Sequence, residues 1–348
     1  MKVPLADLQA QYAALKPDID IAVGRVLASG HYILGDDVAA LEREVAADHH
    51  VPHAIGVSSG SDALLAALWA AGVGPGDEVI TTALSFFASA GAIARLGATP
   101  VFADIDPSTF NLDPVSALAR VTKRTKAFVP VHLFGRPCEL EPLRAAKLPI
   151  VEDAAQAYGV AVGTLATLSF FPTKNLGAAG DGGMVLTTDD DLADRVRLYR
   201  GHGAKPKYVH HVVGANLRLD TLQAAILRVK RAHVAVWTAK RRANAARYRE
   251  LLAGTPLVLP DDVSGHVWHH FVVRAPKRDE LRPFLAAREI ETEVYYPRAL
   301  HLQPCFGGAE GSLPEAERAT REALALPVHA ELTEAQLDHV ASAIRAFY

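Results

Sequence analysis

From about residue 54 onward, short runs of β-branched and apolar residues alternate with helical stretches, and this alternation restricts the possible folds more than any other feature. Helices are expected from Gly60, over Asp113 to Val121 and over Asp189 to Arg200. Strands separated by helices favour a parallel sheet, and strands that are apolar throughout need cover on both faces. We therefore predict an α/β fold with a large, mixed but mostly parallel sheet. The expected strands are AIGVS at 54 to 58, EVITT, TPVFADID, KAFVPVHL, PIVED and GGMVLTT.

The pattern changes near Asn216. Residues 217 to 254 contain no proline, and their composition predicts one long helix, straight or kinked. Strands are then expected at VWHHFVVRA and ETEVYY, with a helix over residues 278–288 between them. A last helix should begin at Thr333, because Thr333 and Gln336 have the spacing of a capping box. We expect a large domain over residues 1–230 and a smaller C-terminal α+β domain over residues 231–348.

The charge balance argues against nucleic-acid and membrane partners. The chain has 36 Lys and Arg against 39 Asp and Glu, a formal charge of −3, so no basic stripe is available for phosphate backbones. Its two cysteines cannot build a disulfide framework, which suits a reducing compartment. The uncharged stretch between Asp153 and Lys174 is too polar and broken to span a membrane, and the N-terminus lacks a signal-peptide core. We expect a cytoplasmic protein with small-molecule partners and self-association.

A strand that ends in small residues precedes a helix at SSGSDALLAAL, residues 58 to 68. The N–H groups of a helix N-terminus favour an anion, Gly60 permits close approach, and Ser59 and Ser61 offer hydroxyl groups. This pattern is typical of a phosphate site. The alternative is an ordinary Ser-Gly helix cap.

Two further motifs carry a carboxylate and a lysine. In PIVEDAAQ, an apolar strand delivers Asp153 to its C-terminal end, where open α/β sheets place their ligands, although an Asp there also suits a helix N-cap. In SFFPTKNLGAAGDGG, Lys174 stands before a glycine-rich run, where a desolvated amine becomes nucleophilic. The alternative is a surface lysine with a packed stem. A phosphate cradle, a strand-end Asp and a lysine together favour pyridoxal 5′-phosphate (PLP), whose ring nitrogen the Asp keeps protonated.

The chain resembles the DegT/StrS family of PLP-dependent sugar aminotransferases, which have the PLP-dependent transferase fold type I of aspartate aminotransferase. The resemblance covers nearly the whole chain and includes GHYILGDDVAALE, SSGSDAL, GPGDEVITT, FADIDPSTFNLDP, VEDAAQ, SFFPTKNLGAAGDGG, GANLRLDTLQAAIL and VYYPRALHLQP. It implies an enzyme that moves an amino group, we expect from L-glutamate, to a nucleotide-linked keto-sugar, with a 3-keto sugar favoured over a 4-keto sugar.

The same resemblance implies roles for individual residues. Lys174 would form the Schiff base with PLP, and Asp153 would face the ring nitrogen. The other cofactor contacts would come from Gly60, Ser61, Phe86, Gln156, Ser169 and, reaching into a neighbouring subunit of a homodimer, Asn216. The substrate pocket would include Tyr32, Arg218, Tyr295, Tyr296 and His301.

Two departures from the family pattern bear on the substrate. The segment between Gln156 and Ser169 is shorter than in most relatives, and Tyr295 stands where many relatives carry His. The first affects access or the dimer edge, and the second the identity of the sugar. A metal site is not expected, because paired histidines such as His269 and His270 point to opposite faces of a strand.

Two other functions compete with transamination. Some members of the family are sugar dehydratases, but these carry His at the position of Lys174. Others have been named regulatory proteins, and a non-catalytic regulator need not keep Asp153, Gln156 and Lys174 together. The expected product is an aminosugar for a surface polysaccharide or a glycosylated metabolite.

Overall fold

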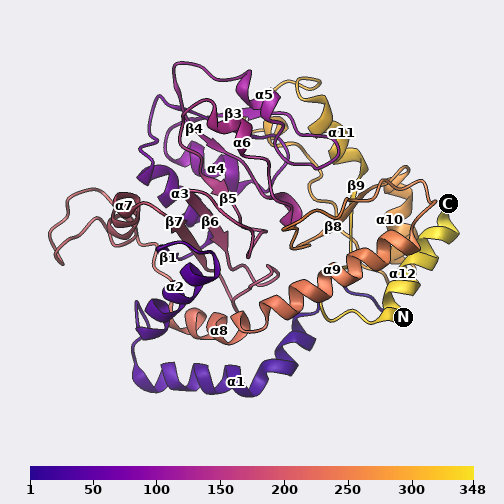
Figure 1. The fold of residues 1–348 in the computed structure, drawn as a ribbon, viewed down its shortest axis with the longest axis horizontal. Helices are drawn as coiled ribbons and strands as arrows, with labels where there is room; N and C mark the ends of the chain where they lie inside the picture. The colour runs from indigo at the N-terminus through magenta and orange to yellow at the C-terminus, as the bar shows by residue number, and fades with distance from the viewer.

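The structure is a computed structural model that describes residues 1–348, with a large sheet flanked by helices and a smaller group of elements toward the C-terminus (Figure 1). The strands are β1 (His53–Val57), β2 (Glu78–Thr82), β3 (Thr99–Ala103), β4 (Thr125–Val129), β5 (Glu152–Asp153), β6 (Leu165–Ser169), β7 (Gly183–Thr187), β8 (Phe271–Arg274) and β9 (Ala323–Leu326). The helices are α1 (Leu8–Ser29), α2 (Asp36–Asp48), α3 (Gly60–Ala70), α4 (Ala88–Arg95), α5 (Pro114–Leu118), α6 (Glu141–Arg144), α7 (Asp190–Arg200), α8 (Thr221–Arg231), α9 (Val234–Leu251), α10 (Arg278–Ala286), α11 (Pro314–Glu322) and α12 (Glu334–Phe347).

Strands β1 to β7 make up one mixed sheet. Strands β3, β2 and β4 pair in parallel, and β5, β6, β7 and β1 follow as a second group. Parallel bridges from Phe128 to Ile150 and from Val131 to Asp153 join the two groups between β4 and β5. Only β7 runs antiparallel to its neighbours β6 and β1. The predicted α/β fold with a mostly parallel sheet is confirmed.

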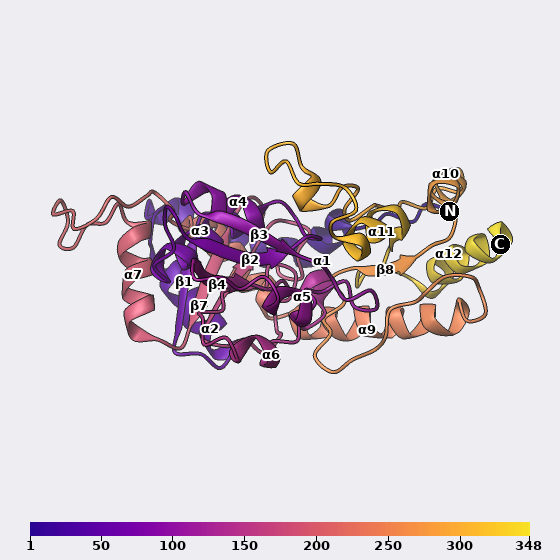
Figure 2. The ribbon, with the colours of Figure 1, turned by 90° about the horizontal axis from the view of Figure 1, so that it is seen from above.

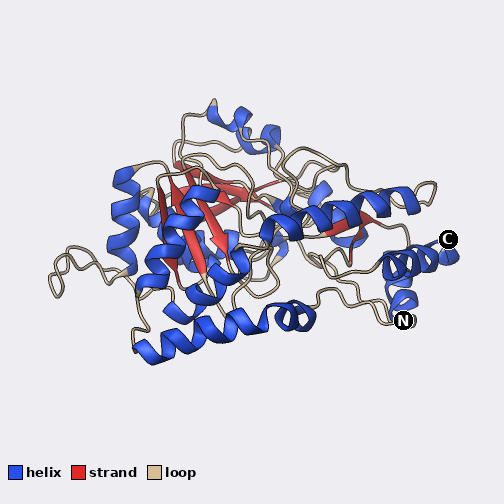
Figure 3. Ribbon diagram, turned by 60° about the horizontal axis from the view of Figure 1, so that its bottom comes forward, coloured by secondary structure: helices blue, strands red, loops and turns tan.

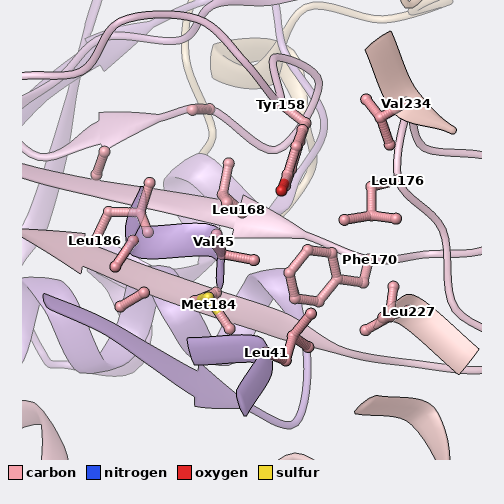
Figure 4. Close-up of a cluster of buried hydrophobic side chains, with 14 of the residues drawn as sticks. Leu41, Val45, Tyr158, Leu168, Phe170, Leu176, Met184, Leu186, Leu227 and Val234 are labelled. Carbon is pink, nitrogen blue, oxygen red and sulfur yellow. The ribbon is translucent and has the colours of Figure 1, made fainter. Parts of the chain in front are cut away.

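Helices cover both faces of this sheet (Figure 3). Along β7, Met184 and Leu186 belong to the cluster that packs against α2 and α8, whereas Val185 belongs to the cluster under α3 and α7. Figure 4 shows the first cluster, where Leu41 of α2 and Leu227 of α8 meet the sheet. Successive strand side chains point to opposite faces, so each face has its own apolar core.

A separate apolar cluster lies among α9, α10, α12 and the antiparallel pair β8 and β9, at the opposite end of the molecule from α7 (Figure 2). Its largest buried side chains include Tyr248, Trp268 and Phe271. Val3 also belongs to this cluster, and its N–H donates to the carbonyl of Glu289 at 2.8 Å. The division into residues 1–230 and 231–348 remains our proposal.

The long helix predicted beyond Asn216 is wrong as a single element. It is interrupted at Ala232 and His233, between α8 and α9. The interruption has a packing reason, because α8 lies on α1 and α2 while α9 continues to the C-terminal cluster. The strand expected at ETEVYY is reduced to one bridge between Glu293 and Ala325.

Other local predictions hold. The strand expected at VWHHFVVRA is present but confined to β8, and the helix expected over 278–288 is α10. Thr333 forms the predicted capping box with Gln336 at the start of α12. No helix is both long and apolar enough to cross a membrane.

The sheet core generates a stability prediction. Leu41→Ala should lower the free energy of unfolding by about 2 to 5 kcal/mol, because it leaves a cavity where Leu41 is completely buried. Leu27→Ala on α1 is the matched control, since Leu27 is 52% exposed, and it should change stability by no more than about 0.5 kcal/mol. Urea unfolding followed by circular dichroism measures both. Equal losses in the two variants would contradict the assigned core.

Candidate active site

A cavity of about 680 Å³ opens at the C-terminal ends of the parallel strands. Phe86 follows β2, Asp153 ends β5 and Ser169 ends β6, so parallel strands of the sheet bring these side chains to one edge. The predicted residues that line it are Gly60, Ser61, Phe86, Asp153, Gln156, Ser169, Lys174, Tyr295 and Tyr296. Most of the predicted site therefore meets in one place.

One end of the cavity is the N-terminus of α3. The N–H groups of Gly60 and Ser61 make no hydrogen bond within the protein. A Cβ atom on Gly60 would lie 2.6 Å from Cβ of Ser169, so only glycine lets the helix and β6 approach this closely. The Ser59 hydroxyl is occupied with Asp62, from whose N–H it accepts at 3.1 Å, so Ser59 is a cap rather than the extra donor we expected. Free amides and hydroxyls at a helix start suit a phosphate.

The deepest charged group is Asp153, which is 4% exposed. Its carboxylate accepts hydrogen bonds from Ser89 Oγ at 2.7 Å and from the Ala155 N–H at 3.1 Å. Burial raises the pKa of Asp153 despite these two donors. The sequence reasoning missed Ser89. A signal was present in the sequence, because Ser85 and Ser89 are four residues apart, and their Oγ atoms lie 3.0 Å from each other. A buried carboxylate with few donors favours a cationic partner.

Lys174 lies on the turn after β6, facing the same cavity. The turn is tight: the Lys174 N–H donates to the Phe171 carbonyl at 2.9 Å, and a Cβ on Gly177 would lie 2.2 Å from the Pro172 oxygen. Burial lowers the pKa of Lys174 to about 8, with Asp153 opposing the shift. The amine is thus partly neutral near physiological pH, as a nucleophile needs to be.

The walls between these groups are aromatic and amide side chains. Gln156 accepts from the Phe134 N–H at 2.6 Å and donates from Nε2 to the Tyr296 hydroxyl at 3.0 Å. Phe86 is 57% exposed, and its ring centroid lies 6.3 Å from that of Tyr296. The Tyr295 ring stacks on His270 with centroids 4.3 Å apart. These side chains line the same cavity as Asp153 and Lys174.

Asn216 and Arg218 lie outside this cavity. They line a neighbouring pocket of about 250 Å³, which shares Asp181 with the main cavity. Arg218 Nε donates to Asn216 Oδ1 at 2.9 Å. Tyr32 is 46% exposed, and its hydroxyl donates to the Leu27 carbonyl at 3.3 Å. These three residues therefore do not reach Lys174 of their own chain.

The structure corrects the prediction for His301. Its ring is buried and does not line the cavity; Nε2 lies 3.1 Å from the carboxylate of Glu317. The same carboxylate accepts from the Gly311 N–H, so His301 helps to hold the loop before α11. The contact with Glu317 holds the His301 ring away from the cavity, so the ring is not available to a substrate.

The argument that paired histidines face opposite sides is wrong for His269 and His270. Both line the cavity, because they precede β8 and follow Trp268, whose φ of 50° turns the chain. Nowhere do three His, Cys, Asp or Glu side chains group in a way that suits a metal ion. The sequence reasoning missed that both rings form part of the cavity wall, where His270 packs on Tyr295.

A lysine, a buried carboxylate and a helix N-terminus around one cavity of an α/β sheet define a PLP-dependent transferase. The model of the DegT/DnrJ/EryC1/StrS aminotransferase family matches residues 14–345, and the chain belongs to this family. The predicted family and fold type are thereby confirmed.

Relatives of the chain include enzymes and a protein named for regulation. The chain is 54% identical to a "Pleiotropic regulatory protein" of Geobacillus stearothermophilus, covering 100% of this chain and 99% of the relative. It is 44% identical to a dTDP-3-amino-3,4,6-trideoxy-alpha-D-glucose transaminase of Streptomyces venezuelae, covering 99% and 96%. A crystal structure of S. venezuelae DesV in complex with a ketimine intermediate superposes with a TM-score of 0.97 at 44% identity, covering 99% and 98%.

The residues present fit PLP, the cofactor of this family. The cradle at Gly60 accommodates a phosphate where a Cβ would collide with Ser169. The buried carboxylate of Asp153 suits the protonated ring nitrogen, and the Lys174 amine, with its lowered pKa, suits covalent attachment to the aldehyde. The predicted cofactor is confirmed for the family, and the roles of the single residues remain proposals.

Lys174 generates a labelling prediction. Borohydride reduction of the holoenzyme should leave the pyridoxyl group on Lys174 and not on Lys230, which is the matched control because burial also lowers its pKa to about 8. Since only the neutral amine attacks the aldehyde, the rate of PLP attachment to the apoenzyme should rise with pH up to about 8 and then level off. Peptide mapping and stopped-flow absorbance measure the two effects. Label on Lys230, or on no lysine, would refute the assignment of Lys174.

Proposed function

We propose that the protein transfers an amino group from L-glutamate to a nucleotide-linked keto-sugar, with a 3-keto sugar favoured over a 4-keto sugar. The observation that carries this proposal is the presence of Lys174 and the buried Asp153 in one cavity, each with a shifted pKa. When bound, PLP supplies the electron sink that lets an amine and a carbonyl exchange their groups. The preference for a 3-keto sugar is supported by the S. venezuelae relative named as a 3-amino sugar transaminase.

Each side chain of the cavity would have a separate role in the reaction. Lys174 would hold the cofactor covalently between turnovers and, once displaced by the donor amine, would take the proton from the donor Cα. Asp153 would keep the ring nitrogen protonated, with Ser89 fixing one carboxylate oxygen at 2.7 Å. Gly60, Ser61 and Ser169 would hold the phosphate, and Phe86 would cover one face of the ring. Gln156 would contact the ring hydroxyl from the Nε2 hydrogen that Tyr296 leaves free.

The sugar and its nucleotide would occupy the space beyond Lys174. Tyr295 and Tyr296 line the cavity there, and Arg218 in the adjoining pocket suits a diphosphate, which a guanidinium can bind with two hydrogen bonds. We propose that Asn216 reaches the cofactor phosphate of a second subunit, so that the active unit is a homodimer with shared sites. The location of Asn216 outside its own cavity supports this assignment.

Two alternatives are weaker. A sugar dehydratase of this family would carry His in place of Lys174. A purely regulatory role is suggested by the name of the Geobacillus relative, but such a role gives no reason for a lysine and a carboxylate with shifted pKa values in one cavity.

We propose a cytoplasmic enzyme of aminosugar biosynthesis, whose product serves a surface polysaccharide or a glycosylated metabolite. Two unpaired cysteines are consistent with that compartment.

The proposed reaction is tested by its two halves. Excess glutamate should shift the absorbance of the holoenzyme and release one 2-oxoglutarate per site. After removal of glutamate, a panel of 3-keto and 4-keto nucleotide sugars is added, and the accepted sugar should restore the original spectrum. Lys174→Ala should give neither change. NMR of the product identifies the aminated carbon: amination at C4 would overturn only the 3-keto preference, whereas no response to glutamate and to every sugar would refute transamination.

The shared site is tested by complementation. Lys174→Ala and Asn216→Ala dimers should each be inactive or nearly so, but mixing them under conditions of subunit exchange should restore activity. One site of each mixed dimer then combines an intact Lys174 with an intact Asn216 from the other chain, so an equal mixture should reach about one quarter of the wild-type activity per site. Arg249→Ala is the control partner, because Arg249 is half-buried on α9 and lines neither pocket. Mixing it with Lys174→Ala should give no more activity than the Arg249→Ala chains give alone. Lack of recovery despite demonstrated exchange would exclude a contribution of Asn216 in trans.

A further inference from the structure

His269 differs from every other buried histidine in having no hydrogen-bond partner. The rings of His49, His132, His266, His301 and His329 all bond to a backbone group or a carboxylate. The ring of His269 is 4% exposed, its Nδ1 is fully buried without a partner, and its Nε2 makes no hydrogen bond either. Buried polar groups are nearly always satisfied, so a ring without any partner in the wall of the cavity that holds Lys174 suggests a ligand for the nitrogen that the cavity reaches.

The backbone around His269 is built to aim this ring. Arg241 of α9 donates from one guanidinium nitrogen to the carbonyls of Trp268, at 3.3 Å, and of His269, at 3.2 Å. On the other side, Asn175 Nδ2 donates to the Val267 carbonyl at 3.0 Å, and Asn175 is the residue after Lys174. The segment is therefore fixed both to α9 and to the turn that carries Lys174, and its side chain enters the cavity between them.

The charges around His269 keep its ring neutral. Burial holds the pKa of His269 well below its usual range, and His270, Lys174 and Arg241 lower it further. A neutral imidazole carries one N–H. Nδ1 is sealed in protein without an acceptor, whereas Nε2 stays accessible from the cavity, so the tautomer with the proton on Nε2 is favoured. The cavity thus receives a neutral N–H donor next to the reactive amine.

We propose that the Nε2–H of His269 binds and polarises the carbonyl oxygen of the keto-sugar. A carboxylate ligand would call for a cation, whereas a neutral N–H suits a carbonyl oxygen, which gains negative charge when an amine attacks its carbon. The hydrogen bond makes that carbon more electrophilic, and no proton leaves the ring. A neutral histidine with a lowered pKa polarises a carbonyl in this way in triosephosphate isomerase. The inference rests on the proposed transamination, whose keto substrate it concerns.

His270 is the natural comparison for this role. It lines the same cavity, but its ring is used in packing, stacked on Tyr295 with centroids 4.3 Å apart and edge-on to Phe134 at 6.1 Å. A phenyl ring at position 270 preserves that packing. His269→Phe removes the N–H and His269→Gln restores a donor near the place of Nε2, while His270→Phe controls for the loss of an imidazole from the cavity.

The experiment uses holoenzyme loaded with an amino group by glutamate and then mixed with the keto-sugar accepted in the panel. His269→Phe should slow this single turnover about 100-fold, the loss typical of one donor to a developing negative charge. His269→Gln should recover most of the rate, and His270→Phe should stay near wild type. A second measurement needs no turnover and uses holoenzyme that has not been treated with glutamate. When a keto-sugar with a 13C-labelled carbonyl binds, its infrared C=O stretching frequency should be lowered in wild type, and this shift should be lost in His269→Phe.

The outcomes separate this proposal from the proposed function. A wild-type enzyme that accepts no keto-sugar refutes both. A wild-type enzyme that works while folded, cofactor-bound His269→Phe turns over at the same rate, or keeps the infrared shift, refutes the role of His269 alone. An equal loss in His270→Phe would also overturn it, because the effect would then belong to the shape of the cavity.

Discussion

The burial of a carboxylate at the junction of the sheet is the constraint on which the site depends. Asp153 ends β5, and its bridge to Val131 helps to join the β3-β2-β4 group to the rest of the sheet. A charge in this position is expensive unless it has donors and a cation. Ser89 and Ala155 supply two donors, and the raised pKa of Asp153 indicates that they are not enough. The fold therefore holds an unfavourable charge ready for a cationic ring.

Burial shifts the pKa of the Lys174 amine in the opposite direction from that of Asp153. Burial lowers the pKa of Lys174 by disfavouring its cation, just as it raises the pKa of Asp153 by disfavouring its anion. The attraction between the two charges opposes both shifts. A ligand that supplies a ring cation to Asp153 and consumes the Lys174 amine relieves both penalties, which explains why one cavity keeps two groups that each destabilise it when empty.

The sheet and most of the cofactor site were predictable because they follow from local sequence. Strand ends such as VEDAAQ and SFFPTK place Asp153 and Lys174 on neighbouring segments, and the order of the parallel strands brings their C-terminal ends together. The break between α8 and α9 was not predictable, since residues 217–254 contain no proline and the break arises from packing on α1 and α2. The failure for His301 has the same origin, because its partner Glu317 is a tertiary neighbour.

The break in the long helix also bears on the site. Because α9 starts afresh at Val234 and crosses to the C-terminal cluster, its Arg241 arrives beside the segment before β8 and fixes the carbonyls of Trp268 and His269. A pattern of alternation would have turned one of the two histidines away from the cavity, but the left-handed turn at Trp268 faces both toward it. The part of the site contributed by the C-terminal elements thus depends on contacts far apart in sequence. The sheet positions the cofactor groups through local order, whereas tertiary packing decides which polar groups meet the substrate.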